Sequence, residues 1–263
     1  MTFAPYIKSS LWLLAYLLFV YLAESFFVYL FNFDFFYNLN DNYIYFLDTV
    51  VYVFLFLLLL VFHRFFYKER AFFACNKIAF KDCLVVIFLI VLLRIVRDPI
   101  INFDYVFFDK ELPTEFYRYS TIELIANLIN VVLLASIFEE ILFRKIIIDF
   151  FLKKNKIIEG VVFSSLLFSL IHINFYRFEF SLSSIATSFI FGLILGYIYT
   201  RTRNVLYPII AHITANFIWL LLGICIEQYW DVIKLFNFGF AYWLIIAASI
   251  IGIFFTLRKI NPT

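Results

Sequence analysis

The stretch Ser136-Ile-Phe-Glu139-Glu140-Ile-Leu-Phe-Arg144 places two adjacent carboxylates and an arginine inside an otherwise apolar run. Charged side chains in a segment of membrane length are costly, so they usually face a bundle interior or a wet cavity and have a partner nearby. The stretch therefore predicts a polar site between buried helices. It also raises the question of which residues are the partners of Glu139 and Glu140.

The composition is typical of a membrane protein. Of the 263 residues, 65% are hydrophobic and only 15% are charged, whereas an average soluble domain has about 25% charged residues. Several apolar runs have the roughly 20 residues that a helix needs to cross a bilayer. We therefore expect an all-α, polytopic helix bundle that occupies residues 1–263 as a single integral-membrane domain. It contacts the lipid bilayer and has no nucleic-acid partner, because its basic residues form no continuous patch.

About eight transmembrane helices fit the pattern of apolar runs. The predicted spans are 11–31, 44–62, 82–97, 132–152, 157–173, 185–199, 205–222 and 241–257. The polar segment 121–130 is predicted to be an interfacial lead-in to the fourth span. Gly192 and Gly196 have the GxxxG spacing of closely packed helices, which we interpret as packing within the bundle.

The distribution of lysine and arginine predicts the orientation. Cytoplasmic connections hold these residues in excess, and here they gather in alternate connections: near Lys8, in 64–81, in 153–156, in 201–203 and at 258–259. An even number of spans preserves this alternation. We therefore predict a multi-pass protein of the cell membrane with both termini in the cytoplasm.

Two of the three histidines lie inside predicted spans and are candidate partners for the carboxylates. His172 ends the fifth span, and His212 shares a helix face with Asn216, four residues on. At 1.5 Å per residue, Glu139 lies about 21 Å from the turn at residue 153, and His172 lies about 24 Å from residue 156. The two side chains are thus predicted to face each other at similar depth on antiparallel helices.

The two adjacent carboxylates are predicted to have separate roles. Glu140 and Arg144 are four residues apart with the acid first, the favourable order for a helical ion pair. Glu139 is displaced by about 100° around the helix and points elsewhere. Glu140 and Arg144 are therefore the supporting half of the stretch, and Glu139 is the reactive half.

Two kinds of chemistry fit these residues. A buried glutamate beside a histidine can act as a general base that activates water, while His212 and Asn216 offer donors to a developing oxyanion. Alternatively, Glu139, His172 and His212 supply the two histidines and one glutamate of a catalytic zinc site. The cysteines Cys75, Cys83 and Cys225 form no CxxC pair, so a thiolate metal site is not indicated. The residues alone leave a metal-free mechanism and zinc open.

Three motifs on separate spans resemble those of the CAAX protease and bacteriocin-processing family of intramembrane endopeptidases. The EExxxR motif corresponds to Glu139, Glu140 and Arg144, the FxxxH motif to Phe168 and His172, and the HxxxN motif to His212 and Asn216. The match covers residues 136–216, in family order.

The resemblance implies an eight-helix bundle in which Glu139 and His172 activate water, His212 and Asn216 stabilise the oxyanion, and Glu140 with Arg144 supports the first motif. The expected function is hydrolysis of a peptide bond in a membrane-associated peptide or protein. Family members are assigned either a metalloprotease or a glutamate mechanism, so the resemblance also leaves zinc open. The alternative within the same family is a non-proteolytic membrane scaffold, a bacteriocin immunity protein or a regulator of sensor proteins.

Overall fold

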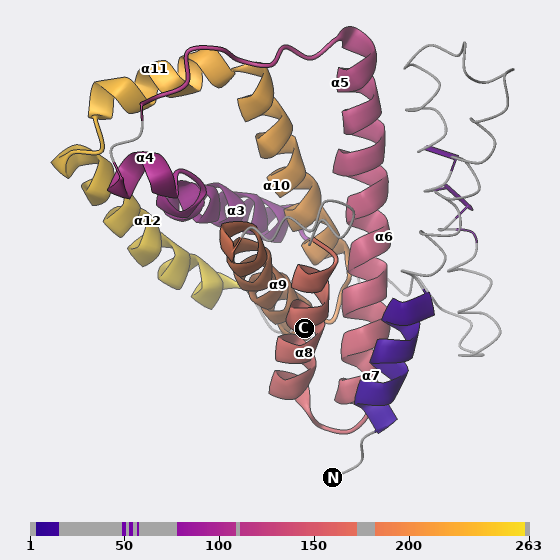
Figure 1. Cartoon of the computed structure of the whole chain (residues 1–263). Coiled ribbons are helices and arrows are strands. Elements are labelled where there is room, and N and C mark those ends of the chain that lie inside the picture. The colour runs from indigo at the N-terminus through magenta and orange to yellow at the C-terminus, as the bar shows by residue number, and fades with distance from the viewer. Residues whose placement is uncertain are drawn as a thin grey trace, which may run out of the picture.

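In the computed structural model, the described residues are 4–15, 49–50, 53–54, 57, 78–108, 111–172 and 182–260. Within these ranges the chain is helical and has no strand, which confirms the predicted all-α class. The first two predicted spans, 11–31 and 44–62, lie mostly outside the described residues. Figure 1 shows the helices gathered into one bundle, with the long helix labelled α5, α6 and α7 along one side.

That long helix, Thr121–Leu152, carries the double carboxylate. It starts at a capping box, in which Ser120 Oγ accepts from the Glu123 backbone N–H and Glu123 accepts from the Ser120 N–H. Its parts are α5 (Thr121–Asn127), the π-helix η1 (Leu128–Ala135), α6 (Ser136–Glu140), the π-helix η2 (Ile141–Ile148) and α7 (Asp149–Leu152). The segment predicted as an interfacial lead-in is thus continuous with the fourth span.

Helices α8 (Ile157–Leu170) and α9 (Leu182–Thr202) pack closely at the two glycines of the GxxxG spacing. A Cβ added at Gly192 would lie 3.0 Å from the Ser165 Cβ, and one added at Gly196 would lie 2.9 Å from a Val161 methyl group. The pairing of 192 with 165 and of 196 with 161 makes the helices antiparallel. The interpretation of the glycines as packing residues within the bundle is confirmed.

Helix α3 (Phe80–Ile101) packs against α10 (Leu206–Ile224) and α12 (Phe240–Lys259). Two shorter helices lie at the bundle's far end, α4 (Phe103–Phe107) and α11 (Ile226–Phe236). Asp98, buried near the end of α3, ties this end together because it accepts from four side chains. They are Arg94, Asn102, Tyr229 of α11 and Tyr242 of α12. Neither this cluster nor α11 was predicted from the sequence.

The basic connections of the described part meet at the opposite end. The Tyr6 hydroxyl of the helix over residues 4–15 donates to Glu159 in the first turn of α8, and Lys156 forms an ion pair with the same carboxylate at 2.7 Å. The Ala79 backbone N–H, at the start of α3, donates to the Tyr207 hydroxyl at the start of α10 at 3.2 Å. The prediction that this end faces the cytoplasm stays a prediction.

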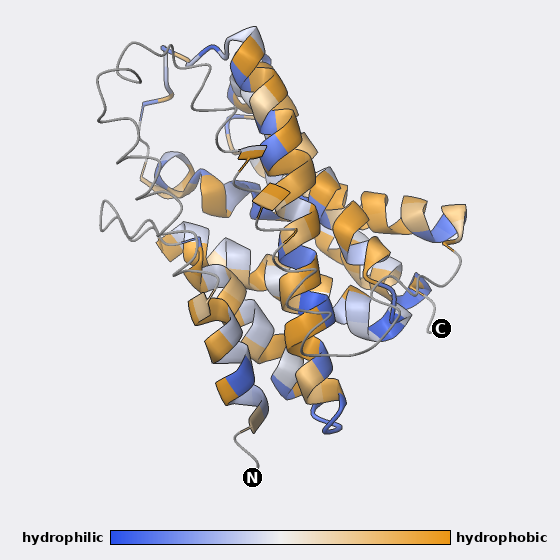
Figure 2. Cartoon of the chain, turned by 90° about the vertical axis from the view of Figure 1, so that its right-hand side faces the viewer, coloured by the Kyte–Doolittle hydropathy of each residue, from blue (hydrophilic) through white to orange (hydrophobic). Residues whose placement is uncertain are grey.

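Four described helices are long and apolar enough to cross a membrane: Thr121–Leu152, Leu182–Thr202, Leu206–Ile224 and Phe240–Lys259. Helix α8 is apolar but shorter, and α3 carries Arg94, Arg97 and Asp98 in its second half. Large apolar side chains such as Ile158 and Phe240 are exposed, and Figure 2 shows hydrophobic residues along the outer faces of the helices. Such an outer surface suits contact with lipid.

Candidate active site

The centre of the site is the buried ion pair between Glu140 and Arg144. Arg144 Nε lies 3.0 Å from Glu140 Oε2, and both side chains are fully buried. The guanidinium also lies over the Phe168 ring of α8, with its Cζ 5.0 Å from the ring centroid. The ion pair predicted from the i, i+4 spacing is therefore confirmed, and the contact of its guanidinium with Phe168 joins the long helix to α8.

His212 brings α10 into the same centre. Its Nδ1 donates to Glu140 Oε1 at 2.8 Å, and its ring is almost completely buried. Since Nδ1 is engaged with Glu140, the other ring nitrogen, Nε2, is the one available for chemistry. The sequence predicted Glu140 as the partner of Arg144 but did not predict that the same carboxylate orients His212.

Glu139 lies beside this free nitrogen. Glu139 Oε2 is 3.9 Å from His212 Nε2, which exceeds hydrogen-bond distance. The Glu139 side chain is 14% exposed, while its Oε2 atom is buried and has no hydrogen-bond partner in the described part of the chain. A carboxylate with this partial access can exchange protons with a bound water.

Asn216 follows His212 by one turn of α10 and is attached to the long helix. Its Nδ2 donates to the Val131 carbonyl at 2.9 Å and to Ser136 Oγ at 3.0 Å. Both amide protons are thus used in binding the long helix. A role in binding an oxyanion requires Asn216 to exchange one of these bonds for the substrate.

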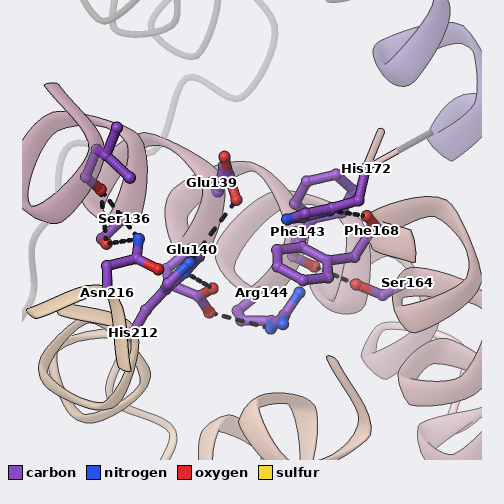
Figure 3. A network of polar contacts seen from close by, with 11 residues as sticks. Ser136, Glu139, Glu140, Phe143, Arg144, Ser164, Phe168, His172, His212 and Asn216 are labelled. Atoms are coloured by element: carbon purple, nitrogen blue, oxygen red, sulfur yellow. Dashed lines mark hydrogen bonds and ion pairs between the residues drawn. The ribbon is translucent and has the colours of Figure 1, made fainter. Parts of the chain in front are cut away.

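His172 lies in the turn just after α8, with its ring 4.7 Å from that of Phe168, measured between centroids. Its Nδ1 donates to the Phe168 carbonyl at 2.8 Å, and the residue is exposed. Figure 3 draws a contact from Glu139 to His212 and none from Glu139 to His172. The predicted pairing of Glu139 with His172 therefore remains a prediction, and His212 is the histidine that contacts Glu139.

Phe168 forms a shared wall of the site. Its ring centroid lies 5.7 Å from that of His212 and 5.3 Å from that of Phe143. Together with the cation contact to Arg144 and the stacking with His172, this ring joins the residues of the three motifs on one apolar surface. The phenylalanine of the FxxxH motif thus has a packing reason to be aromatic.

The zinc alternative requires Glu139, His172 and His212 to converge on one ion. Among the residues that the structure describes, no three His, Cys, Asp or Glu side chains lie close enough together to hold a metal. Glu139 and His212 are neighbours, but His172 contacts neither of them. In this arrangement the three donors do not fit a preformed three-ligand zinc site.

Two π-helical segments flank the double carboxylate, η1 before it and η2 after it. Ser136 Oγ donates to the carbonyl of Val131, five residues earlier, at 3.4 Å. Wide helical turns of this kind are rare and occur frequently at functional sites. They were not predicted, because apolar residues surround the motif on every face and give no periodicity that would distinguish a π-helix from an α-helix.

Comparison with known families agrees with the motifs. Residues 121–218 match the family model described as type II CAAX prenyl endopeptidase Rce1-like. The match begins at the first residue of α5 and ends in α10, so it includes all three motifs, and it confirms the resemblance inferred from them. No curated protein and no solved structure matched the chain.

Proposed function

We propose, from the match of residues 121–218 to the CAAX type of protease, that this protein is an intramembrane endopeptidase with Glu139 as its general base. One observation carries the proposal. The free Nε2 of His212 and the Glu139 carboxylate lie 3.9 Å apart, beside a fully buried ion pair. Two hydrolytic groups with separate hydrogen-bond environments are thereby held within reach of one water and one carbonyl.

The charges of the site support these roles. Two carboxylates, Glu139 and Glu140, lie beside one guanidinium, that of Arg144. With the Nδ1–H of His212 donated to Glu140, Nε2 points to the Glu139 side, where, when it carries a proton, it can donate to an oxyanion.

The proposed reaction proceeds through a tetrahedral intermediate. Glu139 takes a proton from water, the water oxygen forms a bond to the carbonyl carbon, and the carbonyl oxygen becomes an oxyanion. His212 Nε2–H, joined by Asn216 once it exchanges a bond, donates to that oxyanion. Glu139 then transfers its proton to the amide nitrogen as the C–N bond breaks. His172 Nδ1 is used by the Phe168 carbonyl, and its Nε2 can hold the water if substrate brings this residue closer.

A single comparative proteomics experiment both tests the proposal and identifies the substrate. Membrane and secreted peptides are compared between cells with the wild-type protein and cells with Glu139→Gln, which preserves side-chain shape but removes the base. Cleavage products are expected in the wild type and absent in the variant. His172→Ala and His212→Ala are expected to reduce the same products. If all three variants leave the products unchanged, the proteolytic assignment is wrong.

The same strains test the non-proteolytic alternative. A scaffold, immunity or sensor-regulating protein that keeps the polar cluster for stability alone should retain its cellular phenotype with Glu139→Gln. The endopeptidase should lose it. Metal analysis of the purified protein, with an assay in the presence of a chelator, addresses zinc separately, and activity without bound zinc is expected.

A further inference from the structure

Arg97, near the end of α3, has no acidic partner in the part of the chain that the structure describes. The residue is half-buried, and its Nε atom is buried with no hydrogen bond. Its guanidinium instead faces an aromatic ring, with Cζ 5.8 Å from the centroid of Phe191 on α9. This half-buried cation therefore has an aromatic contact but no oppositely charged partner among the described residues.

The neighbouring carboxylate cannot supply that pairing. Asp98 follows Arg97 directly but is turned toward α11 and α12, where four donors occupy both of its oxygens at 2.8 to 3.2 Å. They are Arg94 Nη1 and the Tyr229 hydroxyl on Oδ1, and the Tyr242 hydroxyl and Asn102 Nδ2 on Oδ2. Asp98 is therefore fully hydrogen-bonded to other side chains, and Arg97 faces α9 without it.

Arg97 lies close to the candidate active site because Phe191 contacts both. The His212 ring centroid is 5.3 Å from the Phe191 centroid, with the rings nearly perpendicular. Through this shared ring, Arg97 Cζ and the centre of His212 can be no more than about 11 Å apart, a span that an extended peptide crosses with about three residues.

We infer that Arg97 binds a carboxylate of the substrate, within about three residues of the bond that is cleaved. This inference rests on the proposed function. A guanidinium presents paired donors that match a carboxylate, so an anionic group approaching Arg97 would complete the interaction that the described part of the chain lacks. The carboxylate belongs either to the end of the substrate chain or to an Asp or Glu side chain. Arg97 is thereby a specificity-determining residue outside the three motifs.

A peptide library distinguishes these sources. Full-length protein in detergent micelles is incubated with apolar decapeptides that carry Asp or Asn at each position in turn. Each peptide is made with a free C-terminal carboxylate and as a C-terminal amide, and mass spectrometry gives the cut site and kcat/KM. Removing the recognised carboxylate is expected to lower kcat/KM roughly tenfold to hundredfold in the wild type. Loss on amidation assigns the carboxylate to the chain end, and loss on exchange of Asp for Asn assigns it to a side chain.

The variants then assign the preference to Arg97. Arg97→Gln should cleave both members of each peptide pair at similar rates, Arg97→Lys should retain part of the preference, and the remote Arg118→Gln should retain all of it. If the wild type shows no preference, or if a folded Arg97→Gln retains it, the inference is wrong while the proposed function stands. If Arg97→Gln does not fold, the test rests on the wild type and Arg97→Lys. A preference for the carboxylate in the wild type that is weaker in Arg97→Lys supports the inference, and an unchanged preference in Arg97→Lys contradicts it. Absence of any cleavage that depends on Glu139 overturns the proposed function as well.

Discussion

At the scale of single residues, the carboxylate of Glu140 has two partners on opposite sides. Arg144 approaches one oxygen from the same helix and His212 approaches the other from α10. The sequence spacing was enough to predict the first contact, because residues four apart share a helix face. The second contact joins residues 72 positions apart, and no local pattern indicates it. For the same reason the sequence could not show that Asn216 is attached to Ser136 and Val131.

Removing one member of the buried pair should destabilise the protein more than removing both. Arg144→Met leaves the Glu140 charge buried without its cation, at an expected cost of about 3–5 kcal/mol in the free energy of unfolding. The double variant Glu140→Gln/Arg144→Met should regain much of that stability, because neither ion then remains and the glutamine oxygen can still accept from His212. Equilibrium unfolding in mixed micelles measures both.

An exposed ion pair provides the control for that experiment. Arg118 and Glu227 are 3.0 Å apart but largely exposed, so Arg118→Met should cost at most about 1 kcal/mol. Equal destabilisation by Arg118→Met and Arg144→Met would contradict the assignment of Glu140 and Arg144 as the buried support of the site. The double variant Glu140→Gln/Arg144→Met is expected to lack proteolytic activity even where its stability is regained, since the charge beside His212 is gone.

At the scale of helices, long apolar runs were readily predicted and departures from regular geometry were not. The spans predicted at 82–97, 205–222 and 241–257 correspond to α3, α10 and α12, whose ends differ by only a few residues. The π segments η1 and η2 depend on which carbonyl each N–H selects, and residue types do not specify that choice. Helix α11 was missed because it has only 11 residues and lies between two spans, where a connecting loop was expected.

The contact between α8 and α9 should be sensitive to a single methyl group at Gly192. An added Cβ there would lie 3.0 and 3.1 Å from Ser165 Cβ and Cα, so the backbones must separate. Gly192→Ala should therefore lower the free energy of unfolding by about 1–3 kcal/mol. Thermal unfolding in detergent tests this.

Gly252→Ala is a matched control on another helix pair. Its added Cβ would meet the flexible end of Leu92, at 2.9 Å from Cδ1, and that side chain can rotate away at lower cost. Two results together would contradict the close packing of α8 on α9. Gly192→Ala would unfold at the same temperature as the wild type, and Gly252→Ala would unfold at a lower temperature.

At the scale of the whole molecule, charge and contacts agree on which helix ends lie together. The start of the chain contacts the start of α8, and the start of α3 contacts the start of α10. These are segments whose lysines and arginines predicted a cytoplasmic location. The four-donor cluster around Asp98 lies at the other end, together with α11. The sequence could thus predict the grouping of ends, although it gave no view of how the first two predicted spans are arranged.

Cys225 offers a direct test of that orientation. It lies between α10 and α11, is exposed, and belongs to the end predicted to face outward. A membrane-impermeant maleimide added to intact cells is expected to label Cys225 in the wild type and to give no labelling in Cys225→Ser. Labelling of Cys225 only after lysis of the cells would reverse the predicted orientation. Cys83, in the first turn of α3, lies at the opposite end and should react only after lysis.

The link between Glu140 and His212 also has a consequence for biosynthesis. A nascent helix containing Glu139, Glu140, Arg144 and Lys145 is a poor candidate for stable insertion by itself, because charged residues near a helix centre oppose partition into lipid. Its second neutralising partner is synthesised 72 residues later. The carboxylate helix should therefore remain beside the insertion machinery until α10 emerges, so that Glu140 and His212 enter the bilayer already paired.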